Sequence, residues 1–215
     1  MKSFKWAVIF LSVIFLSLNK LKSAQDIIID DELADLIVEQ LHKGNNVTIS
    51  TQNGTNSSPS DLNVFKQNGS GDITVLSDIR VPASSNFAKL SLIAERHINL
   101  EASDSADGIR LQNLQTGSSV GGNVFSFEAK RDINIDGIID NFGGGDGSIL
   151  LKSKDGGDIN INATIDANKG GFIIDGNDVV IKNPRTILFA GGTNVINNSV
   201  QITADNELKL SLIHI

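Results

Sequence analysis

Aspartates recur at one position in the chain, directly before short runs of alternating apolar residues. Asp72, Asp132 and Asp158 each precede such a run, and Asp178 lies at an equivalent position in a later one. Stacked carboxylates could act as general acid and base on a glycosidic bond, often beside Ca²⁺ or a basic residue. They could also accept hydrogen bonds from nearby backbone and form a ladder of turns. Because three of them share the place before a strand, we interpret the row as turn structure and nominate no catalytic residue.

Other residue types that carry chemistry are scarce. The chain has no Cys and three isolated histidines, His42, His97 and His214, which excludes thiolate sites and disfavours zinc. No arrangement of Ser, His and Asp can be nominated as a triad. The segment 143–149 is similar to the glycine-rich nonapeptide of calcium-binding β-rolls, but Asp146 has the wrong offset and the unit is not repeated. We interpret it as a turn, and expect no metal and no cofactor.

The charge of the chain argues against nucleic acid as a partner. The sequence has 18 Lys and Arg against 25 Asp and Glu, which gives a formal net charge of -7. The basic residues are scattered, so phosphate backbones would be repelled. The abundance of Asn and Gly, together with Ile, Val and Leu, indicates many strands joined by tight turns.

The aspartates belong to a repeat, in which a polar pair is followed by an alternating strand. It occurs at 71–75, 96–100, 131–135 and 157–161. The spacings are 25, 35 and 26 residues, counted between Ile73, Ile98, Ile133 and Ile159, so one interval holds an insertion of about ten residues. We place this insertion between Ala102 and Asn123. Further strands are predicted at 47–50, 90–94, 124–129, 137–140, 149–153, 163–166, 172–175, 179–181, 186–189 and 200–203.

A unit of about 20 to 26 residues is too short to enclose a core of its own, but stacked units can cover one another's apolar faces. In these strands the apolar residues alternate, so one face is buried and the other meets solvent. We therefore predict an all-β fold, a parallel β-solenoid whose repeats occupy residues 45–209. The alternative is an antiparallel sandwich, which would require hairpin turns and would not explain the recurring motif.

Residues 24–44 are predicted to hold an N-terminal strand and a short helix. The helix runs from Glu32 to Lys43, with Asp30 or Asp31 as its cap and Gly44 at its end. Its apolar positions recur at helical spacing: Leu33, Leu36, Ile37 and Leu41. We expect this helix to cover the first coil, whose backbone groups would otherwise be unpaired. A helix that binds a partner is the alternative.

Both ends of the sequence are predicted to lie outside the solenoid. Residues 1–23 have the pattern of a signal peptide, in which Lys2 and Lys5 precede a short apolar run, so we expect export and no stable membrane span after cleavage. An uncleaved anchor is the alternative. Residues 210–215 resemble the translation of an adapter used for sequencing libraries, which would make the chain a fragment of a longer protein. A genuine C-terminal strand is the alternative there.

Two polar segments are predicted to leave the solenoid as loops. Residues 51–70 are rich in Ser, Asn, Gly and Gln, and residues 101–122 have the same character and include Asp104 and Asp107. Long loops are where rigid scaffolds often carry binding residues. Both segments are therefore candidate ligand contacts, with solvated decoration of the surface as the alternative.

The segments 33–41, 44–49, 71–75, 90–100 and 129–135 resemble the recurring unit of filamentous-haemagglutinin-type large exoproteins, which are secreted bacterial adhesins. Gly-Asp-Ile-Thr-Val and Arg-Asp-Ile-Asn-Ile are typical copies, and the resemblance extends over about residues 26–204. It implies a right-handed parallel β-helix, a Gram-negative source, and secretion or display at the cell surface through an outer-membrane pore partner.

One departure from that family concerns secretion. The Asn-Pro-Asn-Gly-type motif of its secretion domain is not seen, since the only Asn-Pro is Asn183-Pro184, followed by Arg185. The route of export therefore stays open. The sequence favours a non-enzymatic adhesin fragment that presents loops to host glycans or surface proteins. The alternatives are a carbohydrate-active β-helix enzyme, either a polysaccharide lyase or a hydrolase, and the structural stalk of a larger exoprotein or toxin.

Overall fold

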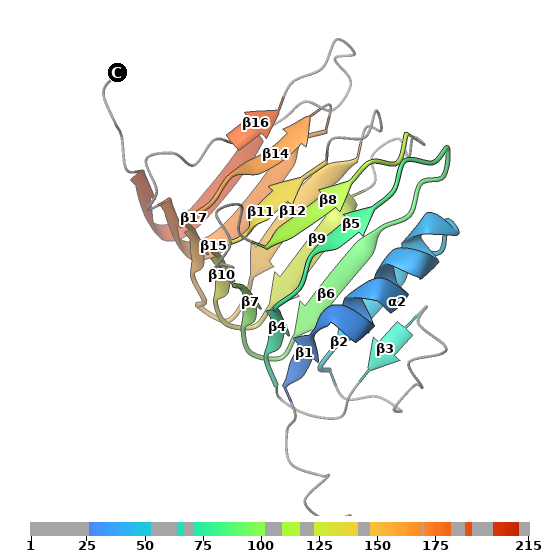
Figure 1. Cartoon of the computed structure of the whole chain (residues 1–215). Helices are drawn as coiled ribbons and strands as arrows, with labels where there is room; N and C mark the ends of the chain where they lie inside the picture. The colour runs from blue at the N-terminus through green and yellow to red at the C-terminus, as the bar shows by residue number, and fades with distance from the viewer. Residues whose placement is uncertain are drawn as a thin grey trace, which may run out of the picture.

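The computed structural model describes residues 26–52, 64–66, 71–101, 109–116, 123–141, 147–168, 170–181, 188–190 and 200–210. Over these residues the chain forms parallel strands and one helix, and the strands curl around a common interior (Figure 1). The predicted signal peptide lies outside the described residues. Of the predicted adapter segment only Leu210 is described, at the end of the last strand.

The strands form a 12-stranded and a 5-stranded sheet, in which every assigned pair is parallel. The larger sheet comprises β1 (Ile27–Ile29), β2 (Val47–Ser50), β3 (Val64–Lys66), β4 (Ile73–Val75), β6 (Leu90–Ala94), β7 (Ile98–Leu100), β9 (Asn123–Ala129), β10 (Ile133–Ile135), β12 (Ser148–Ser153), β13 (Ile159–Ile161), β15 (Phe172–Ile181) and β17 (Val200–Leu210). The smaller sheet comprises β5 (Ile79–Val81), β8 (Arg110–Asn113), β11 (Ile138–Asp140), β14 (Ile165–Asn168) and β16 (Leu188–Ala190).

The chain passes through the two sheets in a repeating order of three strands, and we call each set of three strands a coil. β4, β5 and β6 make one such set, followed by β7, β8 and β9 and then by β10, β11 and β12. Each strand pairs with the strand at the same place in the next coil. The chain therefore winds as a parallel solenoid does.

The four copies of the repeat lie in register. Ile73 pairs with Ile98, Ile98 with Ile133, and Ile133 with Ile159, whose other neighbour is Val179. The predicted all-β architecture of parallel, stacked strands is confirmed by this register. The antiparallel sandwich is wrong, because it would place neighbouring strands in opposite directions.

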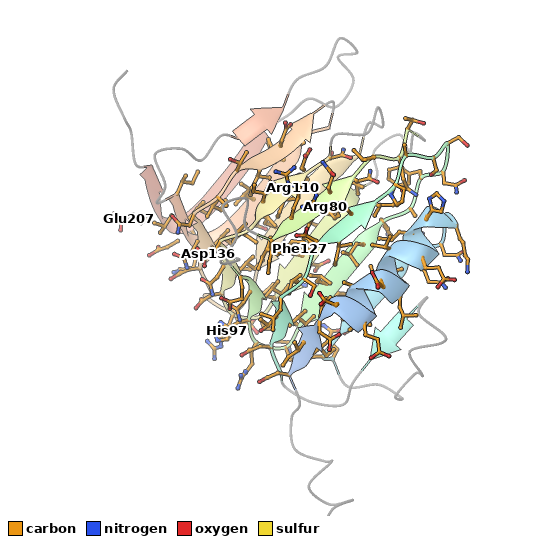
Figure 2. The ribbon with its side chains drawn as sticks, viewed as in Figure 1. Arg80, His97, Arg110, Phe127, Asp136 and Glu207 are labelled. Atoms are coloured by element: carbon orange, nitrogen blue, oxygen red, sulfur yellow. The ribbon has the colours of Figure 1, made fainter. Side chains whose placement is uncertain are left out.

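The core lies between the sheets and follows the alternation in the sequence. β4, β7, β10 and β13 each bury their first and third residues and leave the middle one half-buried. Phe125, Phe127 and Phe172 are the largest fully buried side chains of the described residues. Figure 2 shows Phe127 inside the curl, whereas His97 and Asp136 lie on its outer side.

The predicted helix is present as α2 (Asp31–His42), one residue earlier than expected at each end. Asp30 caps it by accepting a 3.1 Å hydrogen bond from the backbone N–H of Leu33. Gly44 follows the helix with a φ of +86°, a conformation that favours glycine. The helix buries three apolar side chains against β1, β2 and β5: Ala34, Ile37 and Leu41.

Two segments predicted as loops contain strands. β3 lies within 51–70 and pairs with β2, and β8 lies within 101–122 and pairs with β5 and β11. The prediction missed β8 because its sequence, Arg-Leu-Gln-Asn, has a single apolar residue, Leu111, which is fully buried. Asp104 and Asp107 lie outside the described residues.

Candidate functional site

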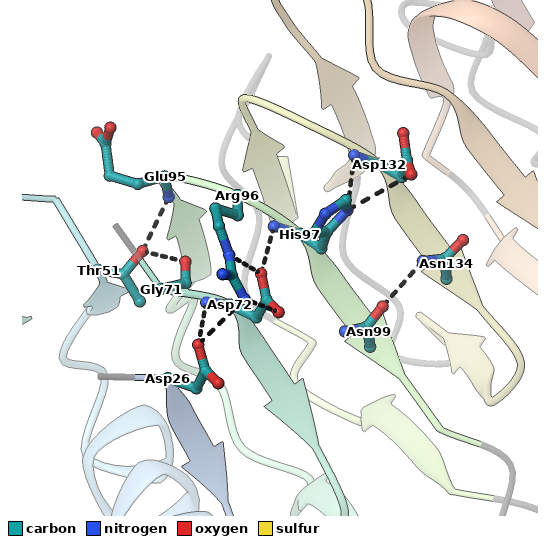
Figure 3. Close-up of polar contacts among 10 residues, drawn as sticks. All are labelled: Asp26, Thr51, Gly71, Asp72, Glu95, Arg96, His97, Asn99, Asp132 and Asn134. Atoms are coloured by element: carbon teal, nitrogen blue, oxygen red, sulfur yellow. Dashed lines mark hydrogen bonds and ion pairs between the residues drawn. The ribbon is translucent and has the colours of Figure 1, made fainter. Parts of the chain in front are cut away.

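The row of aspartates forms a ladder that joins coil to coil (Figure 3). In Asp26, Asp72, Asp132 and Asp158, a side-chain oxygen accepts a hydrogen bond from the backbone N–H of the residue at the same place in the next coil. Asp26 accepts from Asp72 at 2.9 Å, Asp132 from Asp158 at 2.9 Å, and Asp158 from Asp178 at 3.1 Å. The sequence predicts hydrogen bonds from these aspartates to nearby backbone, whereas the backbone partner of each bond lies one coil away.

His97 occupies one position of this ladder. The backbone N–H of His97 donates to Asp72 Oδ1 at 3.0 Å, and Nδ1 of His97 accepts from the N–H of Asp132 at 3.2 Å. Nδ1 also lies 3.5 Å from Asp132 Oδ2. An imidazole here does what a carboxylate does in the other coils.

Asp72 and Arg96 form a two-pronged ion pair beside the ladder. Arg96 Nε donates to Asp72 Oδ1 at 2.9 Å and Nη2 to Oδ2 at 2.7 Å. Burial by itself would raise the pKa of Asp72, but hydrogen bonds from Arg96 and from the backbone N–H of His97 outweigh it, and the pKa is lowered. The carboxylate is therefore held in its charged form.

A second ladder consists of asparagines on the outer side of β7, β10 and β13. Asn134 Nδ2 donates to Asn99 Oδ1 at 2.9 Å, and Asn160 Nδ2 donates to Asn134 Oδ1 at 3.1 Å. The three residues are register partners and all are half-buried. Figure 3 shows the first pair beside the Asp132 turn. The repeat predicted these strands, whereas the amide ladder itself was missed.

A pair of carboxylates on the smaller sheet was also missed. Asp140 of β11 and Asp166 of β14 are register partners, and Gln112 Nε2 donates to Asp140 Oδ2 at 3.0 Å. Burial raises the pKa of Asp140, and the charge of Asp166 adds to this, against the opposing effects of Gln112 and Arg110. Within the described residues, Asp140 Oδ1 and Arg110 Nε are buried without a hydrogen-bond partner.

The sequence did contain a signal for that pair. Both carboxylates end an Ile-Asp pair in strands that were predicted, at 137–140 and 163–166, and they are separated by the same 26 residues as two copies of the repeat. Equal spacing in a solenoid places residues at the same position on neighbouring coils, where they are register partners. The aspartates before the repeat strands recur more often and therefore give the stronger sequence signal.

The described residues hold no cluster of three or more His, Asp or Glu side chains arranged for a metal ion. In the same part of the chain, α2 is too short and too polar to cross a membrane, and no other helix is present. His42 ends α2, whereas His214, Asp146 and the Asn183-Pro184 pair lie outside the described residues.

Comparison with known proteins finds no match to a family model, a curated protein or a solved structure.

Proposed function

We propose that the chain is part of an exported bacterial adhesin, a right-handed parallel β-helix that presents its loops and outer surface to host glycans or proteins. The observation that supports it best is the periodic outer surface of the larger sheet. Polar groups of one kind recur there from coil to coil, as in the Asn99, Asn134 and Asn160 ladder. Repetition of weak polar contacts along a rod increases the strength of attachment through multivalency.

The handedness and the export route belong to the same proposal. Connections between parallel strands of one sheet are almost always right-handed, because strand twist favours that crossover. The sequence resemblance to filamentous-haemagglutinin-type exoproteins supports the same hand. The signal-peptide pattern at 1–23 supports secretion or display at the surface of a Gram-negative cell, with an outer-membrane pore as a partner.

The test is adhesion by the purified chain after removal of residues 1–23. Beads coated with it should attach to host epithelial cells, and beads coated with an Ile133→Asp variant should not, because Ile133 is fully buried and a charge there unfolds the coils. Attachment no greater than that of uncoated beads would overturn the proposal.

Deletion of residues 53–62 separates adhesion by this segment from a purely structural role. This deletion leaves β2 and its partner β3 in the chain. Loss of attachment would assign the contact to that segment. Unchanged attachment would place it elsewhere on the coils, and would favour the stalk alternative if variants of the outer surface also attach normally.

A carbohydrate-active enzyme is a second candidate, favoured by the Asp140 and Asp166 pair. Neighbouring parallel strands lie about 4.8 Å apart, close to the roughly 5 Å separation of the two carboxyls in retaining glycosidases. The raised pKa of Asp140 suits a general acid beside an ionised partner. Incubation with neutral and acidic glycans should then release reducing ends or unsaturated products, and Asp140→Asn and Asp166→Asn should abolish them. Absence of products from every glycan would reject this candidate.

A further inference from the structure

The outer side of β4, β7, β10 and β13 forms a surface that we call the amide face. Its central row is Thr74, Asn99, Asn134 and Asn160, which are consecutive register partners. All four side chains are half-buried and point away from the core, since the residues on either side of each are buried. The face therefore presents one polar group per coil, at intervals of about 4.8 Å.

The amides of this row retain hydrogen-bonding capacity after the ladder is made. A primary amide has two N–H donors and an oxygen that can accept twice. Asn134 uses one donor toward Asn99 and accepts once from Asn160. One donor and one acceptor site of Asn134 thus stay available for a ligand that lies along the row.

Carboxylates border the row on the side where the strands end. Glu101 follows β7 and Asp136 follows β10, and both are exposed. The backbone N–H of Glu101 donates to the carbonyl oxygen of Val75 at 3.3 Å, and that of Asp136 donates to the carbonyl oxygen of Leu100 at 2.8 Å. Both acceptors lie on the preceding coil. Two negative charges therefore lie beside the amides, on successive coils.

The opposite border is the aspartate ladder. Its cationic neighbours are Arg96, which is engaged by Asp72, and Arg131, which is exposed. The carboxylates of this border, which include Asp132 and Asp158, outnumber the two arginines. The amide face as a whole is negative, so it is complementary to a cationic partner.

One end of the amide face is apolar. Ile28 and Leu76 are the exposed large hydrophobic residues of the described chain, at 54% and 48% exposure. Ile28 is the register partner of Thr74, and the backbone N–H of Leu76 bonds to the carbonyl oxygen of Ile29. They are therefore close neighbours at the start of the amide row. Such a patch can pack against C–H groups of a ligand that elsewhere makes polar contacts.

We propose that the amide face binds a linear glycan that carries free amino groups. A polymer of repeated sugars offers hydroxyl groups at regular intervals to the asparagine row, and C–H faces to Ile28 and Leu76. Its ammonium groups are attracted to Glu101 and Asp136. An extended peptide offers no such repetition of hydroxyl groups. The inference rests on the proposed adhesin function and assigns its ligand to a sheet face rather than to a loop.

The test measures binding of a glucosamine hexamer and of its N-acetylated, uncharged counterpart to the chain lacking residues 1–23. The double variant Glu101→Gln/Asp136→Asn removes two charges from the amide face without changing side-chain size. The control Glu32→Gln/Asp35→Asn removes two exposed charges from α2. We expect the face variant to weaken hexamer binding roughly three- to tenfold and the control to leave it unchanged. Asn134→Val should weaken it as well, with circular dichroism confirming the fold.

Each alternative result would overturn the inference. Equal weakening by the two double variants would show attraction to net charge alone, and equally tight binding of the uncharged hexamer would show that ammonium groups are not recognised. Preferential binding of a Lys-rich peptide would assign the face to a protein partner. If coated beads attach to cells while the hexamer does not bind, this inference fails and the adhesin function stands. If the beads fail to attach, the adhesin function itself fails.

Discussion

Asp72 and Asp140 are partly buried carboxyls on the outside of the coils, and their surroundings move their pKa values in opposite directions. Burial raises the pKa of both, but Asp72 is bonded by Arg96 and by a backbone N–H, which outweigh the burial. Asp140 has Gln112 as its hydrogen-bond donor and the charge of Asp166 nearby. The first carboxylate therefore stabilises the fold when ionised, whereas the second opposes it.

Asp72→Asn should destabilise the protein at neutral pH, because the ion pair with Arg96 is lost. The folded-state pKa of Asp72 is below its ordinary value of 3.8, so its contribution is present above 3.8 and is lost as the pH falls through the lowered value. Urea unfolding of both proteins between pH 7 and pH 2.5 measures this. The difference should shrink toward the acid end, and a constant difference would contradict the assignment.

Asp140→Asn should have the opposite effect at neutral pH and stabilise the protein. The folded-state pKa of Asp140 is above its ordinary value of 3.8, so the cost of ionising it develops as the pH rises from 3.8 through the raised value. The variant and the parent should have equal Tm below that range, with the variant higher at pH 7. A lower Tm for the variant at pH 7 would show that the charge of Asp140 is favourable.

Among the elements, α2 closes the first coil by packing on β1, β2 and β5. Ile37 is fully buried in this contact, whereas Asp35, two residues earlier, is exposed. Ile37→Ala should cost about 2 to 5 kcal/mol of unfolding free energy, because it leaves a cavity under the helix. Asp35→Ala should change it by less than about 0.5 kcal/mol. Similar losses for both variants would mean that the helix does not pack tightly on the coils.

The elements that could be predicted from sequence are those with strong local patterns. Ile133 and Ile135 flank an asparagine and alternate clearly, and Gly44 marks the end of a short apolar helix. β8 was missed because its sequence is polar, and β3 was missed because Val64 and Phe65 are two apolar residues within a long polar segment. The pairing of both depends on strands that lie elsewhere in the chain. The partners of Asp72, of Asn134 and of Asp140 were missed for the same reason. Each lies on a neighbouring coil, 24 to 35 residues away.

At the scale of the whole molecule, the proposed adhesive surface depends on how coils of unequal length are brought into register. The interval between Ile98 and Ile133 is longer than its neighbours, and yet the two residues are partners. Polar residues at the same position of each repeat thus become register partners and form a row on the outer side of the sheet.

The in-register contact between Asn99 and Asn134 is the feature on which both the ladder and the amide face depend, and disulfide formation tests it directly. The chain has no Cys, so an Asn99→Cys/Asn134→Cys variant introduces a single reporting pair. Neighbouring parallel strands lie about 4.8 Å apart, within the Cα separation of a disulfide, whereas Thr74→Cys/Asn134→Cys places the thiols two coils apart at roughly 10 Å. The first variant should oxidise to an intramolecular disulfide and the second should stay reduced. Failure of the first to oxidise, or equal oxidation of the second, would contradict the stacked solenoid.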